Sequence, residues 1–449
     1  MSRNPFIFGA PIQNLQQFFN RDDITKRIMN RLLNMGDSSV IGERRVGKTS
    51  LLYYLQEPEI ARRHGLDPNQ YLFVYFNFDS AGDLSPTIFW QRLLRSLSQK
   101  ISDGGLRAQI DPLLSMEKIH PFKIEDLFEA ITDKGFRVVF LLDEFEAVTQ
   151  ATDLDADFFS HLRSLATMRF IGLIFVTSSR QKLSEMSHAG IVGSPFFNIF
   201  ETFFLKPFDP ESAEASITVS LAGTGASFDP QEKAYLMAIS GRHPFFLQMA
   251  ASYLFDAYTI YGLAGDQLRP ARLERIEREF LSQAQPHFAH YWEKSTDYEK
   301  IFMAALSCLK LGSAENSTID MESMKHAYRQ ADVAVHLLED RGLVSRDSGG
   351  YQIFSQAYEQ WIVQEISRPT TGRGHYKTWL EQNEPYYGGT LQALYALADN
   401  VTAHVSPKYW NLLTEWLTKS DDPAKVFALF KDAATAKAGR PVWLNFVRE

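Results

Sequence analysis

Eight residues, Gly42 to Thr49, constrain the fold of this chain more than any other stretch. They read GERRVGKT and fit the phosphate-binding loop pattern G-x-x-x-x-G-K-[ST]. Glycine at two points of such a loop lets the backbone turn where a side chain would obstruct it, so that successive N–H groups face phosphate oxygens. The apolar residues 39–41 before the loop predict a buried strand, and residues 50–55 after it have helical spacing. Strand, loop and helix in this order favour a P-loop over an incidental glycine turn.

The side chains of this loop have different expected roles. Lys48 is positioned to reach the β- and γ-phosphates, and the hydroxyl of Thr49 is positioned to bind Mg²⁺. The helix that follows adds its positive N-terminal end. The residues expected to contact nucleotide in and just after the loop are Gly42, Arg45, Val46, Gly47, Lys48, Thr49 and Ser50.

An acidic pair follows a second apolar run. Residues 138–142 are all apolar and lead directly into Asp143 and Glu144. Ligands of an open parallel sheet bind at the carboxyl ends of its strands. On their own, two acids after a strand would be interpreted as a helix cap. Downstream of a P-loop, we expect Asp143 to hold Mg²⁺, directly or through water, and Glu144 to act as the general base on the attacking water.

Alternating strands and helices predict a parallel α/β sheet over residues 1–209. Besides the segments above, the pattern predicts strands at 71–79, 170–177 and 198–208 and helices at 22–34, 86–102 and 122–134. Asn20 is the expected N-cap of the helix at 22–34. If the 170–177 strand lies beside the Asp143 strand, the polar residues 177–179 at its end can sense the γ-phosphate or hold the attacking water, and Arg180 adds positive charge there. A solvated strand end is an equal alternative. Arg163 or Arg169 could reach a neighbouring subunit's phosphate, although a solvated or structural role is favoured for both.

The second half of the chain has a different character. Residues 210–295 predict an all-helical domain, in which Gly241 ends one helix and Pro244 begins the next. Helices followed by a short hairpin at 296–366 predict a winged helix, with a helical bundle as the alternative. The Pro/Gly/Thr-rich residues 367–374 are the clearest linker. Residues 375–449 predict a small helical domain whose recurrent aromatic residues favour a core over a ligand site.

Composition narrows the class of protein further. The single cysteine, Cys308, excludes an intramolecular disulfide framework and a cysteine-rich metal site. A net charge of −8 does not favour a polyanionic partner, although a local basic face remains open. The sequence shows no signal peptide and no apolar stretch long enough to span a membrane, so we expect a cytoplasmic protein without membrane association.

The order of these motifs over residues 5–366 resembles the STAND class of P-loop ATPases, signal-transduction switches related to AAA+ proteins. Phe18 to Asp22, which includes Arg21, resembles the motif whose backbone borders the adenine. Asp143 and Glu144 resemble the Walker B end, and Arg180 is similar to the arginine that senses the terminal phosphate. The stretch 241–244 resembles the motif whose proline, here Pro244, packs near the base. The resemblance implies ATP or ADP with Mg²⁺ as cofactors.

The resemblance also implies a switch. An ADP-bound closed form exchanges its nucleotide for ATP, opens and assembles into homo-oligomers that activate an effector. No sensor repeats or fused effector are visible, so the 375–449 domain is a candidate adapter for a separate effector or sensor protein. The alternative is a DNA-associated ATPase, of the kind that loads helicases or regulates transposition. The acidic balance and the modestly basic stretch 324–330 weigh against that alternative. A P-loop protein with negligible turnover is a third hypothesis.

Overall fold

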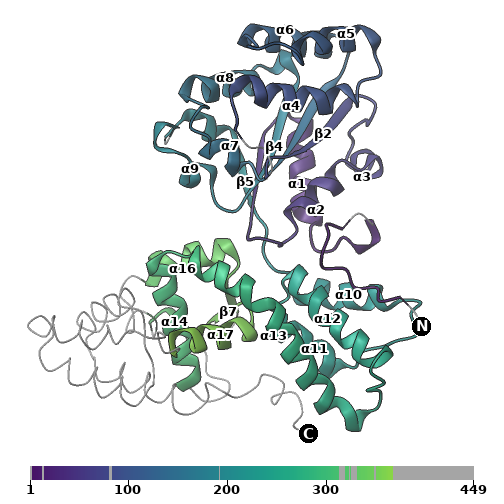
Figure 1. The fold of residues 1–449 in the computed structure, drawn as a ribbon, viewed down its shortest axis with the longest axis vertical. Helices are drawn as coiled ribbons and strands as arrows, with labels where there is room; N and C mark the ends of the chain where they lie inside the picture. The colour runs from purple at the N-terminus through teal and green to yellow at the C-terminus, as the bar shows by residue number, and fades with distance from the viewer. Residues whose placement is uncertain are drawn as a thin grey trace, which may run out of the picture. The chain divides into compact units, whose positions relative to one another are not determined.

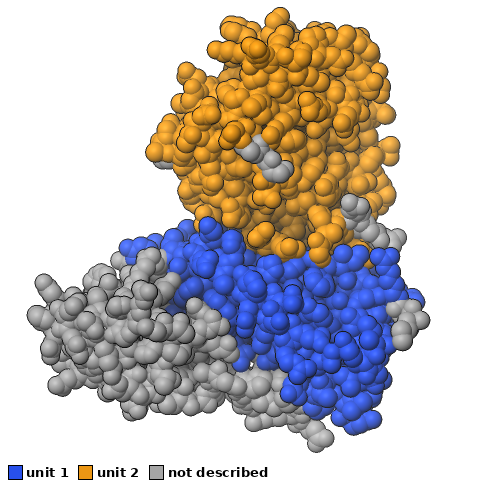
Figure 2. Space-filling view, in the orientation of Figure 1, with its two compact units in different colours: residues 1–8, 207–449 blue, residues 9–206 orange. Residues whose placement is uncertain are grey.

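The chain forms two compact units, which are coloured separately in Figure 2. The structure is a computed structural model that describes residues 3–12, 15–79, 83–191, 193–312, 319–322, 324, 331–347 and 350–367. One unit comprises the described residues between 9 and 206, and the other comprises those of 1–8 and those from 207 onward. The predicted domain at 375–449, nearly all of the predicted linker at 367–374, and all but Met324 of the basic stretch 324–330 lie outside the described residues.

A parallel sheet of five strands forms the centre of the first unit, in the order β2-β3-β4-β1-β5 (Figure 1). The strands are β1 (Ser38–Ile41), β2 (Tyr71–Asn77), β3 (Arg137–Asp143), β4 (Leu173–Ser179) and β5 (Glu201–Phe204). The predicted α/β class is therefore confirmed. The pairing also fulfils the condition attached to Arg180, because β4 runs parallel to β3, with Leu142 opposite Thr177.

Helices cover both faces of this sheet because its central strands are apolar on both sides (Figure 1). Along β3, Phe140 and Leu142 belong to one core, and Val139 and Leu141 belong to the other, as the alternation of side chains along a strand requires. The first core contains α4 (Pro86–Ser98), α5 (Gly104–Leu113), α6 (Pro121–Asp133) and α8 (Ala156–Thr167). The second contains α1 (Asp22–Leu33), α2 (Lys48–Leu55) and α3 (Pro58–Arg63). The shorter elements of this unit are η1 (Leu15–Gln17), α7 (Glu146–Gln150), η2 (Arg169–Ile171), α9 (Leu183–Met186), η3 (Ala189–Ile191) and η4 (Pro195–Ile199).

Four local predictions differ from the structure. The predicted strand 198–208 is reduced to β5, because η4 extends to Ile199 and the strand ends at Phe204. The predicted helix 86–102 ends at Ser98, and a separate helix, α5, begins after Asp103, whose side chain accepts a hydrogen bond from the Leu106 N–H. The predicted strand 170–177 begins later, because residues 169–171 form the turn η2. Asn20 was expected to cap α1, but the cap position is Arg21, which makes no side-chain cap, and Asn20 instead adopts left-handed backbone with φ 55°.

The second unit is helical apart from one hairpin. Its elements are α10 (Pro210–Leu221), α11 (Pro230–Ser240), α12 (Pro244–Thr259), η5 (Asp266–Leu268), α13 (Arg269–Glu293), α14 (Asp297–Gly312), α16 (Ala331–Arg341), β6 (Val344–Asp347), β7 (Gly350–Ile353) and α17 (Gln356–Ser367). Asp209 and Asp229 cap α10 and α11 through their side chains, as expected for an acid before proline. The predicted hairpin is present as antiparallel β6 and β7. Its assignment to a winged helix stays a prediction.

The turn at Gly241 is in close contact with the segment that follows the hairpin. It ends α11 in left-handed backbone with φ +62°, and Pro244 begins α12. A methyl group on Gly241 would overlap the carbonyl oxygen and the ring of Phe354. Ser355, the next residue, donates a hydrogen bond of 2.6 Å to the Ile239 carbonyl. The turn therefore packs directly against residues 354–355.

Among the described residues, no helix combines the length and apolar character that a membrane crossing requires.

Gly241→Ala should destabilise the helical unit. Left-handed backbone costs a non-glycine residue about 1 kcal/mol, and the overlap with Phe354 should add roughly 2 kcal/mol. Urea unfolding followed by circular dichroism measures the sum. Gly223→Ala is the matched control, because Gly223 also has a positive φ but no atom lies within 4 Å of an added methyl. Equal losses in the two variants would show that the approach to Phe354 is not a constraint.

Candidate functional site

The loop Gly42 to Thr49 connects β1 to α2 in a strained backbone. Gly47 has φ 106°, and Arg45 also adopts a positive φ, 66°, which is uncommon for a residue with a side chain. Gly42 is required for space, since an added Cβ would lie 2.7 Å from Val46 Cγ1 and 2.9 Å from the Leu205 carbonyl oxygen. Helix α2 starts directly after Gly47, so the loop and the helix N-terminus together have the geometry that suits an anion.

Lys48 is folded back onto the loop. Its Nζ donates hydrogen bonds to the carbonyl oxygens of Gly42, at 2.9 Å, and Glu43, at 3.3 Å. The side chain is buried. A phosphate, which is negatively charged, can attract this ammonium group away from the two carbonyl oxygens. Ser50 has a different partner, since its Oγ accepts a hydrogen bond of 3.1 Å from the Ile12 N–H.

Asp143 is the best-connected side chain of the site. It is fully buried at the end of β3. Its Oδ2 accepts hydrogen bonds from Thr49 Oγ1 at 2.6 Å and from the Tyr75 hydroxyl at 3.0 Å. A longer contact of 3.4 Å comes from Asn77 Nδ2. Ser178 Oγ and the Glu144 N–H donate to Oδ1. The two residues predicted to bind Mg²⁺ are therefore in direct contact, and both offer oxygen atoms.

Glu144 follows Asp143 in left-handed backbone with φ 53°. Burial raises the pKa of its carboxyl group to about 7, and the negative charges of Glu146 and Asp143 act in the same direction, whereas Lys48 opposes them. A carboxyl group with a pKa near neutral pH can exchange protons there, which suits the predicted general base. The short α7 that begins two residues later is fixed to the sheet, because the Phe145 N–H donates to the Ser178 carbonyl at 2.8 Å.

Arg180, just beyond the end of β4, has Glu146 as its ionic partner. Arg180 Nε lies 2.8 Å from Glu146 Oε1, and the Glu146 side chain is 4% exposed whereas that of Arg180 is 30% exposed. Burial alone would lower the pKa of Arg180, but the hydrogen bond and charge of Glu146 outweigh it and raise the pKa. The charges of Glu144 and Glu43 raise the pKa of Arg180 in the same direction as Glu146.

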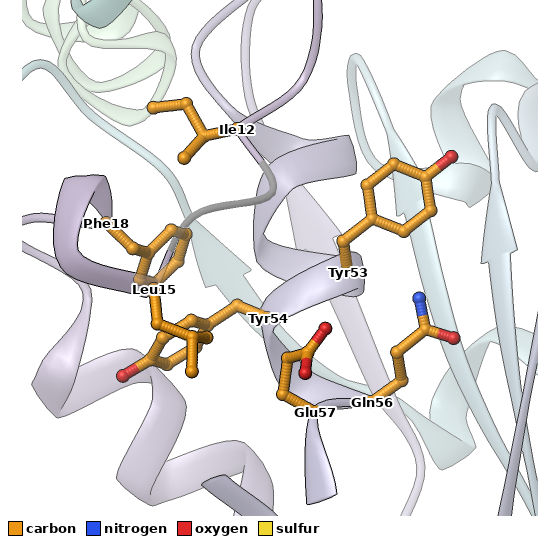
Figure 3. Close-up of a pocket in the computed structure, with 7 residues that line it drawn as sticks. All are labelled: Ile12, Leu15, Phe18, Tyr53, Tyr54, Gln56 and Glu57. Atoms are coloured by element: carbon orange, nitrogen blue, oxygen red, sulfur yellow. The ribbon is translucent and has the colours of Figure 1, made fainter. Parts of the chain in front are cut away.

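Arg21, predicted to border the nucleotide, is hydrogen-bonded to the backbone of the P-loop. One of its terminal nitrogens donates to the carbonyl oxygens of Val46, at 3.3 Å, and Lys206, at 2.9 Å. Beside this segment lies a cavity of about 400 Å³ (Figure 3). Phe18, stacked on Tyr54 with ring centres 3.9 Å apart, lies on one side of it, and Tyr53 lies on the other. The remaining lining residues are Ile12, Leu15, Gln56 and Glu57.

The structure brings together most of the predicted site residues within the first unit. Pro244 belongs to the helical unit, so its role near the base stays a prediction. The Arg163 side chain is exposed on α8, and the favoured solvated role and the alternative of action in trans both stay untested predictions. Sequence reasoning missed three residues that contact the predicted ones, namely Tyr75, Asn77 and Glu146. It placed Ser178 at the end of the strand beside Asp143, but not its hydrogen bond to the Asp143 carboxylate. Strand register was the available signal, since parallel pairing sets Asn77 opposite Asp143.

Comparisons with known proteins agree with the fold. Residues 33–301 match the model of a protein family described as Novel STAND NTPase 2. The structure of a Walker-type ATPase of Pyrococcus abyssi is 13% identical, with a TM-score of 0.51, and the match covers 80% of this chain and 99% of that one. For the ORC2 protein of Aeropyrum pernix in its ADPNP–ADP complexes, the corresponding values are 13%, 0.50, 81% and 98%. At these identities the likeness concerns the fold alone. The sequence matches none of the curated proteins with which it was compared.

The raised pKa of Glu144 predicts a pH-dependent stability of the nucleotide-free chain. The folded state holds the proton of the Glu144 carboxyl group more tightly than the unfolded state does. The resulting contribution to the free energy of unfolding is fully present below pH 4.5 and is lost as the pH rises through about 7. Burial also raises the pKa of Asp37 to about 7, with the same sign of effect. Asp37→Asn removes this second contribution from both proteins that are compared. The effect of Glu144 is therefore the difference between Asp37→Asn and the double variant Asp37→Asn/Glu144→Gln.

Urea unfolding with a chelator present, at pH values between 4.5 and 8, measures this dependence. We expect the free energy of unfolding of Asp37→Asn to fall with rising pH, and Glu144→Gln to flatten that decline. Identical slopes in the single and double variants would contradict the assigned environment of Glu144.

Proposed function

Because this chain belongs to the Novel STAND NTPase 2 family, we propose that it is a switch that binds and hydrolyses ATP and whose nucleotide state controls its conformation and self-assembly. Its family and its fold make it a P-loop NTPase of the STAND and AAA+ type. One observation carries the proposal. The P-loop hydroxyl of Thr49 and the carboxylate of Asp143 are in hydrogen-bond contact, with Glu144 beside them and Lys48 in the same loop as Thr49.

The P-loop is proposed to bind the phosphates of ATP or ADP. Backbone N–H groups of residues 42–49 and the start of α2 surround the phosphate oxygens, and Lys48 leaves its two carbonyl acceptors for the β- and γ-phosphates. The oxygen donors of Thr49 and Asp143 fit Mg²⁺, which prefers oxygen ligands. When bound, Mg²⁺ neutralises charge on the phosphate oxygens.

Glu144 is proposed to accept the proton of the attacking water. With its pKa raised to about 7, its ionised form is a stronger base than an ordinary carboxylate and is still populated near neutral pH. Arg180 is proposed to stabilise the negative charge that develops on the γ-phosphate, which its exposure of 30% leaves accessible. The segment 18–22 is proposed to border the base, and the aromatic side chains of the cavity beside Phe18 support that location.

A γ-phosphate can shift a conformational equilibrium only through contacts that differ between the two states. Lys48 and Arg180 are the candidates, because each is held by protein groups that a phosphate would replace or supplement. We propose that the ATP state assembles as a homo-oligomer in the cytoplasm, in signalling or defence. The 375–449 segment is then the proposed docking part for a protein effector or sensor.

Glu144→Gln should abolish hydrolysis while leaving ATP binding intact. Loss of a general base lowers the rate by roughly a hundredfold or more. Single-turnover hydrolysis of radiolabelled ATP measures the rate, and equilibrium binding of a fluorescent ATP analogue measures affinity. Glu117→Gln, which changes an exposed acid of the same unit, should leave both unchanged. Lys48→Ala should instead weaken binding. Hydrolysis by Glu144→Gln at the wild-type rate would show that the assignment of the base is wrong.

A further inference from the structure

Glu146 is a buried acid that the proposed chemistry does not use. It is buried at the first position of α7. Its Oε1 accepts from Arg180 Nε at 2.8 Å, and its Oε2 is buried without a hydrogen-bond partner among the described residues. Burying a carboxyl group with one oxygen unpartnered costs stability that an apolar residue of similar size would avoid. The presence of Glu146 at this position therefore calls for a reason other than packing.

The contact with Arg180 uses only part of the guanidinium group. Nε donates to Glu146, and no hydrogen bond of the two terminal nitrogens to a described residue is present. A guanidinium group has a fixed planar shape, so a bond at Nε sets the direction of the terminal N–H groups. Those terminal groups remain available for a second, anionic partner.

Glu146 is itself held on a rigid frame. The residue before it, Phe145, donates its backbone N–H to the Ser178 carbonyl, and the Thr149 carbonyl at the far end of α7 accepts from the His188 N–H. Phe145 is also buried in the core beneath the sheet. Arg180 follows β4 without a helix of its own, so its side chain depends on Glu146 for a defined direction.

We propose that Glu146 is a positioning residue, which holds Arg180 by Nε so that its terminal nitrogens meet the terminal phosphate of bound ATP. This inference rests on the proposed function. It makes Glu146 a determinant of the preference for ATP over ADP, because only ATP has the phosphate that Arg180 contacts. It also explains why the acceptor is fixed and buried while the cation is partly exposed, since only the cation has to face a ligand.

The test compares affinities for ADP and for a non-hydrolysable ATP analogue, both with Mg²⁺, by calorimetry on the full chain. Removing Arg180 alone would leave Glu146 buried and unpaired, so the reference variant is Arg180→Gln/Glu146→Gln. We expect it to lower the ratio of analogue affinity to ADP affinity about tenfold, the value of one charge-assisted hydrogen bond. Glu146→Ala should approach the same low ratio although Arg180 is present.

Glu146→Gln separates positioning from simple stabilisation. Its amide oxygen still accepts from Nε, so the ratio should stay close to that of the wild type even if the melting temperature changes. Glu185→Gln, which removes a carboxylate on nearby α9 that pairs with Lys182, should change nothing. A wild-type ratio in Glu146→Ala, with a lowered ratio in the reference variant, would overturn the inference alone. If the wild type binds nucleotide no more tightly than Lys48→Ala does, the proposed function itself is wrong.

Discussion

The rest of the site depends on the hydrogen bonds that the fully buried carboxylate of Asp143 accepts. A carboxylate out of contact with water is tolerated only when hydrogen-bond donors replace the water. Here the donors come from three neighbouring elements, with Thr49 from α2, Tyr75 from β2 and Ser178 from β4. Satisfying one charge therefore fixes the end of β3 against both adjacent strands and against the P-loop helix.

This arrangement links the two halves of the site mechanically. Thr49 follows Lys48 directly, so a movement of the P-loop helix changes the hydrogen bonds of Asp143. Glu144 and α7 continue from Asp143, and α7 carries the acid that holds Arg180. A ligand that draws Lys48 or Arg180 toward itself therefore alters contacts that extend across four strand and helix ends. These are the contacts through which bound nucleotide would favour one state over the other in the proposed switch.

The sequence allowed the fold and the centre of the site to be predicted because both depend on local patterns. The loop Gly42 to Thr49 and the apolar run before Asp143 each identify a strand end without knowledge of the neighbours. The partners of Asp143 were not predictable in the same way. Residues 177–179 are all hydroxylic, and only the structure shows that Ser178 contacts Asp143 while Ser179 contacts the Gln181 carbonyl. Helix α5 was missed because Gly104 and Gly105 at its start argue locally against a helix.

The central claim is that the γ-phosphate changes the assembly of this chain, and particle mass in solution tests it most directly. The mass is measured with ADP and then with a non-hydrolysable ATP analogue plus Mg²⁺, using Lys48→Ala as the control. The account predicts a defined larger species that forms only with the analogue and is absent in the variant. An unchanged mass, under conditions where binding of the analogue is demonstrated, would contradict it.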